Sequence, residues 1–195
     1  AREAIDASVI FKLDPPDALA RLATARRVCK ALRTAFFATK ARLAADAPDR
    51  AWTFETDVVF ARFDRFLERI IMLEDVLTTC TEFNRLERVE VGGTKGKVLS
   101  AQVSQVFEQF TTLSAAFGQV EYDALDPEEV IFPGEYRTFR AAITDLERRI
   151  AAIVSQAFDD CATVWSMFKL FDSFDALLMR DAIRATVEAK SPQLI

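Results

Sequence analysis

The sequence predicts an all-α protein, an elongated bundle of several long amphipathic helices that forms a segment of a helical rod. Its 195 residues include only five Gly and six Pro, too few for the closely spaced turns of a β-sandwich or barrel. Residues 17–47, 49–91 and 135–191 contain neither residue, and such stretches are too long to be strands. Apolar residues recur in them at alternating steps of three and four, the period of a helix that buries one narrow seam.

The positions of Gly and Pro set the expected helix boundaries. Asp14 is a suitable N-cap and Pro15 suits a first helical turn, so the second helix should open there. Gly92 follows the apolar seam of the predicted helix at 53–88, and Gly118 follows that of the predicted helix at 98–120. We expect helices near residues 1–13, 15–46, 53–88, 98–120, 135–171 and 174–189.

Composition excludes several classes of function. Histidine is absent, which removes Ser-His-Asp and Cys-His mechanisms and any His-ligated metal. Three scattered cysteines, Cys29, Cys80 and Cys161, suit neither a zinc cluster nor a disulfide framework, and they favour a reducing compartment. The net charge of −5 gives general nucleic-acid binding little support, and no apolar window is long enough for a membrane span. We expect no catalytic residue, cofactor or metal in this chain.

The segment from Gly92 to Lys97 superficially resembles a phosphate-binding loop. Such a loop needs four residues between its first Gly and the Gly-Lys pair, followed by Ser or Thr, whereas here three intervene and Val98 follows. The helical period also continues into the loop, so no strand precedes it. The spacing favours a tight interhelix connection, and nucleotide binding by this loop remains the enzyme alternative.

One flank of the second predicted helix is basic. Residues 15–47 carry seven basic and two acidic side chains, and Arg26, Lys30, Arg33 and Lys40 lie beside the apolar seam. The flank is either a dock for an acidic partner or simply a solvated surface. A weaker alternative is a module that grips nucleic acid or an acidic protein surface.

The 17 Phe residues exceed what the seams need. Several aromatic residues lie off the main stripes, and a helix with two apolar stripes contacts two neighbours. The surplus therefore indicates either additional helices or apolar surface that another chain covers. Two of the off-stripe aromatic residues, Phe37 and Trp165, are candidate partner-facing residues. The other candidates are the basic residues Arg26, Lys30, Arg33 and Lys40.

Two acidic pairs are unsuitable as metal ligands. Neighbours on a helix point about 100° apart, so neither Glu128-Glu129 nor Asp159-Asp160 converges on one ion. Asp126 is better interpreted as an N-cap, with the glutamates in the first turn that follows. For the second pair we expect a surface position or pairing with a neighbouring helix.

From Trp52 onward the sequence resembles the N-terminal tail region of dynein heavy chains. Many short motifs occur in one order over about 140 residues, although no single motif is specific. They include Trp52-Thr53-Phe54, Phe66-Leu67-Glu68-Arg69, Glu82-Phe83-Asn84-Arg85-Leu86-Glu87, Gly92-Gly93-Thr94-Lys95-Gly96-Lys97, Tyr122-Asp123-Ala124-Leu125-Asp126, Ala157-Phe158-Asp159-Asp160-Cys161, Phe168-Lys169-Leu170 and Phe174 to Arg180. The glycine pattern is more similar to axonemal heavy chains, with the outer arm preferred.

The resemblance implies a non-catalytic scaffold. Dynein heavy chains are ATP-driven microtubule motors whose nucleotide sites lie in AAA+ modules far downstream of the tail. The tail would associate with other heavy chains and WD-repeat intermediate chains, indirectly with light chains, and with docking proteins or the doublet microtubule of a cilium or flagellum. No nucleic acid or membrane is implied, and a passive rod that binds nothing is the alternative.

Two features limit the resemblance. The family often has Arg-Pro before an isoleucine near the end, whereas Asp181-Ala182 separates Arg180 from Ile183, so we expect the last helix to run on without a break. Residues 1–51 carry no matched motif and form a separate segment before the tail bundle at 52–195. Because the chain starts at Ala1 without Met, we take it as a stretch of a longer protein.

Overall fold

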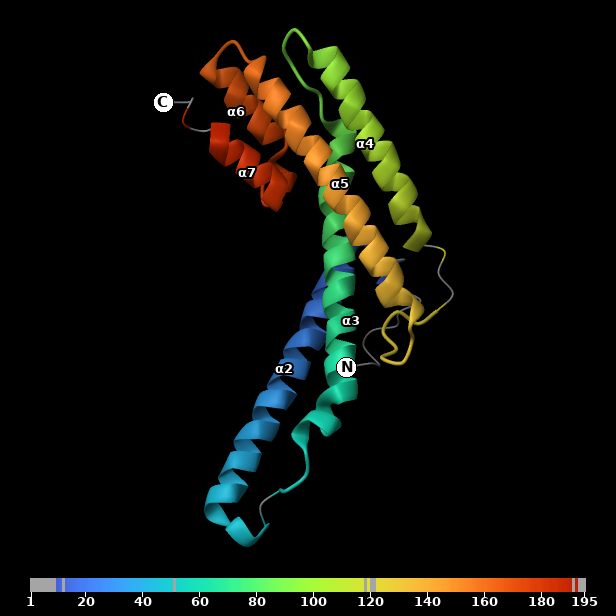
Figure 1. Ribbon diagram of the computed structural model, residues 1–195, viewed down its shortest axis with the longest axis vertical. Coiled ribbons are helices and arrows are strands. Elements are labelled where there is room, and N and C mark those ends of the chain that lie inside the picture. The colour runs from blue at the N-terminus through green and yellow to red at the C-terminus, as the bar shows by residue number, and fades with distance from the viewer. Residues whose placement is uncertain are drawn as a thin grey trace. The chain divides into compact units, whose positions relative to one another are not determined.

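The all-α prediction is confirmed. The computed structural model describes residues 10–11, 13–50, 52–117, 119, 122–190 and 192, and these contain helices and no strand. Most of the helix expected near 1–13 lies outside the described residues. The α-helices are α2 (Pro15–Asp46), α3 (Thr56–Phe83), α4 (Gly96–Phe117), α5 (Ile131–Asp159), α6 (Val164–Ser173) and α7 (Asp181–Lys190) (Figure 1). Short 3-10 turns are η2 (Pro48–Arg50), η3 (Asn84–Arg88) and η4 (Asp175–Leu177).

The chain folds into two compact units. The first comprises Ala1–Thr78 and Glu121–Gly134, and the second comprises Thr79–Val120 and Glu135–Ile195. Helices α3 and α5 therefore each contribute residues to both units. In the first unit α2 and the first part of α3 form an antiparallel hairpin (Figure 1). The second unit contains α4, most of α5, α6 and α7.

The hairpin of the first unit follows the predicted seam over the first half of α2 only. Helix α2 begins at Pro15 as expected, although the Asp14 side chain makes no capping hydrogen bond. The buried residues of α2 lie in its first half and are Ala18, Leu22, Ala25 and Cys29. In the second half of α2 the hairpin is packed through aromatic rings, and Phe36 packs against Phe60 of α3 with 4.8 Å between centroids. Trp52, in the connection, packs against Phe36 with tilted rings 5.2 Å apart.

The second unit has a larger aromatic and aliphatic core. The predicted seam of α4 is buried, with Val103, Val106 and Phe110 fully inaccessible. Phe110 stacks on Phe83 at 5.0 Å, and Phe117 meets Phe139 of α5 edge-on at 5.0 Å. Each fully buried side chain of this size contributes roughly 1.5–3 kcal/mol through apolar burial, so these contacts are the main source of the stability of the unit.

The prediction of a single helix at 135–171 is wrong at both ends of α5. It begins earlier, at Ile131, because the Glu129 carboxylate accepts hydrogen bonds from the backbone N–H groups of Ile131 and Phe132 at 2.7 and 2.8 Å. Pro133 is tolerated there because a first-turn residue needs no intrahelical N–H bond. Asp126, the expected N-cap, instead accepts from the N–H of Glu128 at 3.1 Å within a turn.

The same helix also ends earlier, at Asp159. A new helix, α6, starts after Thr163, whose side chain accepts a hydrogen bond from the backbone N–H of Ser166 at 3.2 Å. The Ser166 hydroxyl accepts in return from the Thr163 N–H at 3.2 Å. This capping box is a local signal that the apolar period concealed, since the spacing of apolar residues continues across the break.

The expectation that the last helix runs on past Arg180 is also wrong. Helix α7 begins at Asp181, after η4 and a turn. The break places the Arg180 side chain in the interior of the second unit, where it forms the hydrogen bonds described below.

Candidate functional site

The glycine loop holds a carboxylate of its own chain. Asp160, just after α5, accepts a hydrogen bond from the Thr94 hydroxyl at 2.5 Å and another from the Lys95 backbone N–H at 2.8 Å. These bonds lower the pKa of the Asp160 carboxyl, the Lys95 backbone bond more than the Thr94 hydroxyl. The loop thus uses the anion-binding geometry of backbone N–H groups, but an aspartate from 65 residues away occupies it.

Two of the loop glycines are required by this arrangement. Gly93 has a φ of 90°, and a Cβ there would overlap the Asp160 carboxylate. A Cβ on Gly96, the first residue of α4, would overlap the carbonyl oxygen of Val91. Gly92 has open space around its Cα. The interpretation of the motif as a tight interhelix connection therefore has a direct geometric reason.

A half-open groove of about 740 Å³ lies beside the loop in the second unit. Its lining combines Arg88 of η3 and Glu90 of the loop with Cys161 and with Ser166 and Lys169 of α6. The charged side chains are two basic, Arg88 and Lys169, and two acidic, Glu90 and Asp160. Because these charges balance, the groove has no electrostatic preference for a phosphate.

Cys29 and Cys80 are poor candidates for a nucleophile. Burial raises the pKa of Cys80 to about 11 and raises that of Cys29, so both are thiols at neutral pH and poor nucleophiles. Cys161 donates to the carbonyl oxygen of Ala157 at 3.3 Å. Among the residues that the structure describes, no group of His, Cys, Asp and Glu could hold a metal ion, and none of the described helices is long and apolar enough to cross a membrane.

Other residues of the motifs that resemble dynein tails also make contacts within their own chain. Asp123 accepts a hydrogen bond from the Leu125 N–H at 2.9 Å, and Leu125 is buried. Tyr122 packs its ring near Phe132 at 6.2 Å. Phe158 is buried and stacks on Phe171 at 5.5 Å. Asp159 pairs with Lys190 of α7 at 2.5 Å, which agrees with the expected helix pairing.

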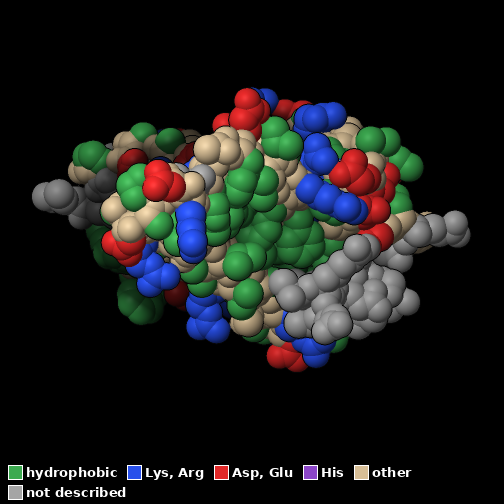
Figure 2. Space-filling view, turned by 90° about the horizontal axis from the view of Figure 1, so that it is seen from below, with side chains coloured by type: hydrophobic (Ala, Val, Ile, Leu, Met, Phe, Trp, Pro, Cys, Tyr) green, Lys and Arg blue, Asp and Glu red, His purple; other side chains and the backbone are tan. Residues whose placement is uncertain are grey.

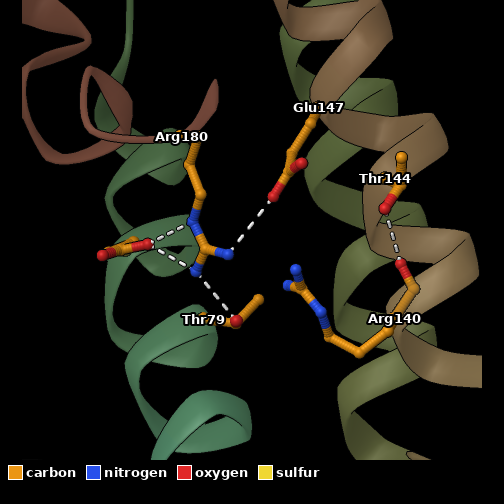
Figure 3. Close-up of polar contacts among 6 residues, drawn as sticks. Thr79, Arg140, Thr144, Glu147 and Arg180 are labelled. Carbon is orange, nitrogen blue, oxygen red and sulfur yellow. Dashed lines mark hydrogen bonds and ion pairs between the residues drawn. The ribbon is translucent and has the colours of Figure 1, made fainter. Parts of the chain in front are cut away.

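Sequence reasoning missed a largely buried charge cluster of the second unit, which surrounds Arg180 (Figure 3). Its guanidinium binds the Glu82 carboxylate through Nη2 at 2.5 Å and Nε at 2.6 Å. It also donates to the Glu147 carboxylate of α5 at 3.2 Å and to the Thr79 hydroxyl of α3 at 2.8 Å. Burial raises the pKa of the Glu147 carboxyl, and the charges of Arg180 and Arg140 oppose that rise.

A weak signal for this cluster existed in the sequence. Glu147 lies four residues after Ile143 and three before Ile150, a spacing compatible with the buried side of the helix, and both Glu147 and Thr79 are buried. A polar residue at a seam position requires a buried partner. Nothing local to α3 or α5 indicated that the partner would be Arg180.

The candidate partner-facing residues separate into two groups. Arg26 pairs with Glu74 of α3 at 3.3 Å, and Arg33 pairs with Asp64 of α3. Lys40 lies over the ring of Phe54 at 5.6 Å. These three side chains therefore contact their own chain.

The other three candidates are exposed. Lys30 is exposed on α2, Phe37 is 40% exposed, and Trp165 of α6 is 78% exposed. Figure 2, which looks onto the end where α2 and α3 are joined, shows hydrophobic side chains on this face with Lys and Arg side chains beside them.

The geometry defines an all-α segment in which the loop carboxylate of Asp160 and the charges around Arg180 join helices of the same chain. The chain belongs to the dynein heavy chain family and matches the family described as dynein heavy chain, N-terminal region 1, over residues 1–195. The match includes the first 51 residues, for which no motif was identified in the sequence.

Individual relatives agree with this assignment. The chain is 41% identical over 191 residues to the dynein beta chain of the flagellar outer arm of Chlamydomonas reinhardtii, covering 98% of this chain and 4% of that protein. It is 36% identical over 198 residues to the ciliary dynein beta chain of Tripneustes gratilla, covering 100% and 4%. It is 37% identical over 142 residues to dynein axonemal heavy chain 17 of Mus musculus, covering 73% and 3%. The chain thus spans only a few per cent of the length of these relatives.

Replacing Gly93 with alanine should destabilise the protein by about 1–3 kcal/mol, because the positive φ is strained for any other residue and the Cβ overlaps Asp160. Gly92→Ala is the matched control, since a Cβ there meets nothing within 4 Å. Urea unfolding followed by far-UV circular dichroism measures both. Equal effects of the two substitutions would contradict the loop geometry.

The Asp160 contacts should make stability depend on acid pH. The folded-state pKa lies below the ordinary value of 3.8, so the contribution is present above that value and is lost as the pH falls through the folded pKa. The difference in unfolding free energy between the parent chain and Asp160→Asn should therefore be larger at pH 7 than at pH 3. A difference that does not change with pH would show that the carboxylate charge is unimportant.

Removing the Arg180 side chain should cost about 3–5 kcal/mol, because Arg180→Ala leaves the buried Glu147 without its main partner. Arg184→Ala is the control. Its side chain is 50% exposed and pairs with Asp181 at the surface, so the loss should be at most about 1 kcal/mol. Chemical denaturation of both variants tests the difference.

Proposed function

We propose that this chain is a non-catalytic segment of the tail of an axonemal dynein heavy chain, of the outer-arm type. Its role is to assemble the heavy chain with other heavy chains and with WD-repeat intermediate chains, and so to link the motor to its doublet microtubule. In this proposal the protein acts in the axoneme of a cilium or flagellum, and ATP hydrolysis takes place in AAA+ modules elsewhere in the heavy chain.

The names of the relatives support the location. They are described as flagellar outer arm, ciliary and axonemal chains. The arrangement of the glycine loop supports a structural role, because the carboxylate of Asp160 occupies the position that a phosphate would need.

The observation that carries the proposal is an exposed apolar stripe on α6. Val164, Trp165 and Phe168 are 49%, 78% and 55% exposed. They lie within one turn and a half of each other on the side of α6 opposite the buried Leu170. Large aromatic side chains are enriched where proteins bind one another, so we assign this stripe, together with Lys30 and Phe37 of the first unit, to contacts with other subunits.

Binding should depend on the α6 stripe. The 195-residue chain, immobilised and incubated with axonemal extract, should capture a dynein heavy chain or a WD-repeat intermediate chain identified by mass spectrometry. The double variant Trp165→Ala, Phe168→Ala should reduce that capture about tenfold or more, because aromatic anchors dominate interface energies.

The control is Val130→Ala, which alters another exposed apolar side chain, 81% exposed. Circular dichroism should show the same helix content in all variants. Capture of neither kind of subunit would support the passive rod instead. Binding to acidic proteins that disappears steeply with salt would support the basic-helix module, and heat on titration with ATP and Mg²⁺ would support a nucleotide site.

A further inference from the structure

The groove beside the glycine loop lies between two contacts that join its walls. At one end Asp160, just before α6, accepts from the Lys95 backbone N–H at 2.8 Å. At the other end Arg85 of η3 pairs with Asp175, just after α6, at 3.8 Å. Residues 88–94 therefore run along α6 in the opposite direction, and both segments line the groove. Its volume of about 740 Å³ is typical of a binding site.

The wall opposite α6 is an extended stretch of backbone. Residues 89–92 belong to no helix or turn, and Val89 has the extended dihedral angles φ −80° and ψ 120°. Val89 donates its N–H to the carbonyl oxygen of Leu86 at 3.1 Å. Val91 donates its N–H to the hydroxyl oxygen of Ser100 in α4 at 2.9 Å. Alternate residues of the stretch are thus bonded to η3 and α4.

The intervening residues, Glu90 and Gly92, present their backbone groups to the groove. In an extended chain the N–H and C=O groups of successive residues point to opposite sides, so those of Glu90 and Gly92 point away from η3 and α4. Both residues line the groove. In the part of the chain that the structure describes, these backbone groups form no hydrogen bond. Such an edge is a template on which a second extended chain can pair.

Gly92 leaves room for a second backbone. A Cβ added there would meet nothing within 4 Å, and Gly92 does not have the positive φ of Gly93. The packing of the described chain therefore does not require glycine at this position. Glycine within an extended segment often marks a place where a ligand or another backbone approaches closely.

Two basic side chains lie at one end of the groove. Arg88 is the last residue of η3, and Lys169 is in the second half of α6, so both are at the end far from Asp160. Both are exposed, and neither forms an ion pair with another described residue. Glu90 lies between the two ends. An acidic side chain of a ligand therefore matches the end of the groove near η3.

We propose that this groove binds an extended, acidic peptide segment of another protein, paired with residues 89–92 as an added strand. The peptide backbone accepts from the N–H groups of Glu90 and Gly92 and donates to their C=O groups. An acidic side chain of the peptide pairs with Arg88 and Lys169. The residues of the α6 stripe do not line the groove, so this inference goes beyond the proposed assembly contacts and does not depend on them.

Peptide display tests for such a ligand. A library of short random peptides is selected on the 195-residue chain with an excess of the soluble Glu90→Pro chain as competitor. Proline removes the N–H of residue 90, and the dihedral angles of Val89 suit a residue that precedes proline. The surviving peptides should carry Asp or Glu and should bind the parent chain in fluorescence polarisation. Circular dichroism checks the fold of the competitor, and Gly92→Val replaces it if helix content falls.

Substitutions in the groove measure the individual contacts of a selected peptide. Glu90→Pro should weaken binding about three- to tenfold, the range for one lost hydrogen bond, whereas Glu90→Ala keeps the N–H and should not weaken it. Gly92→Val should weaken binding about tenfold or more by filling the groove, with the urea midpoint unchanged. Lys169→Glu should weaken it about tenfold. Lys97→Glu, at an exposed position outside the lining, is the control.

Methylation of the peptide backbone tests the strand pairing. Only every second N–H of a paired strand points toward its partner. Of two peptides that are N-methylated at alternate positions, one should therefore lose binding and the other should retain it.

Four results would overturn the proposal: no peptide survives the competition, the survivors bind the Glu90→Pro and Gly92→Val chains as tightly as the parent, both methylated peptides bind equally well, or the survivors lack acidic residues and ignore Lys169→Glu. None of these results bears on capture of dynein subunits through the α6 stripe, so the two proposals fail separately.

Discussion

A buried positive charge fixes how the helices of the second unit are aligned. Arg180 is 11% exposed at its side chain, and it reaches two carboxylates and a hydroxyl on α3 and α5. Apolar seams that repeat every three or four residues pack almost equally well after a shift of one turn. A buried guanidinium does not tolerate such a shift, because an unpaired charge in the interior is strongly destabilising. The pairing therefore selects one alignment among several that the seams allow, and it positions the start of α7.

The glycine loop, at the edge of the second unit, is likewise held by a polar contact between residues far apart in the sequence. Its backbone N–H and hydroxyl groups need an acceptor, and Asp160 supplies one. The contact ties the start of α4 to the end of α5 and leaves a groove with balanced charges. A motif that looks like a nucleotide site in the sequence is thus a joint between two helices. Position 93 of that joint accommodates only glycine without strain.

The first unit stabilises its hairpin with different chemistry. Only the first half of α2 buries aliphatic side chains, and the second half depends on the rings around Phe36. Arg33 pairs with Asp64 and lies over the rings of Phe37 and Phe60 at 5.8 and 5.4 Å. Charges on this flank thus serve the hairpin. Val28 and Leu32 of the same helix remain exposed.

The sequence alone determined the fold class, the start of α2 at Pro15 and the seam of α4, because apolar period, proline geometry and propensity act over a few residues. It also predicted the family, through motifs spread over most of the chain. The apolar period gave the wrong boundary where a polar side chain caps a helix, as Glu129 does for α5 and Thr163 for α6. Tertiary structure alone decided that Asp160 fills the glycine loop and that Arg180 joins Glu82 and Glu147. These partners are 33 to 98 residues apart, and hydrogen-bond geometry between distant residues leaves no period in a sequence.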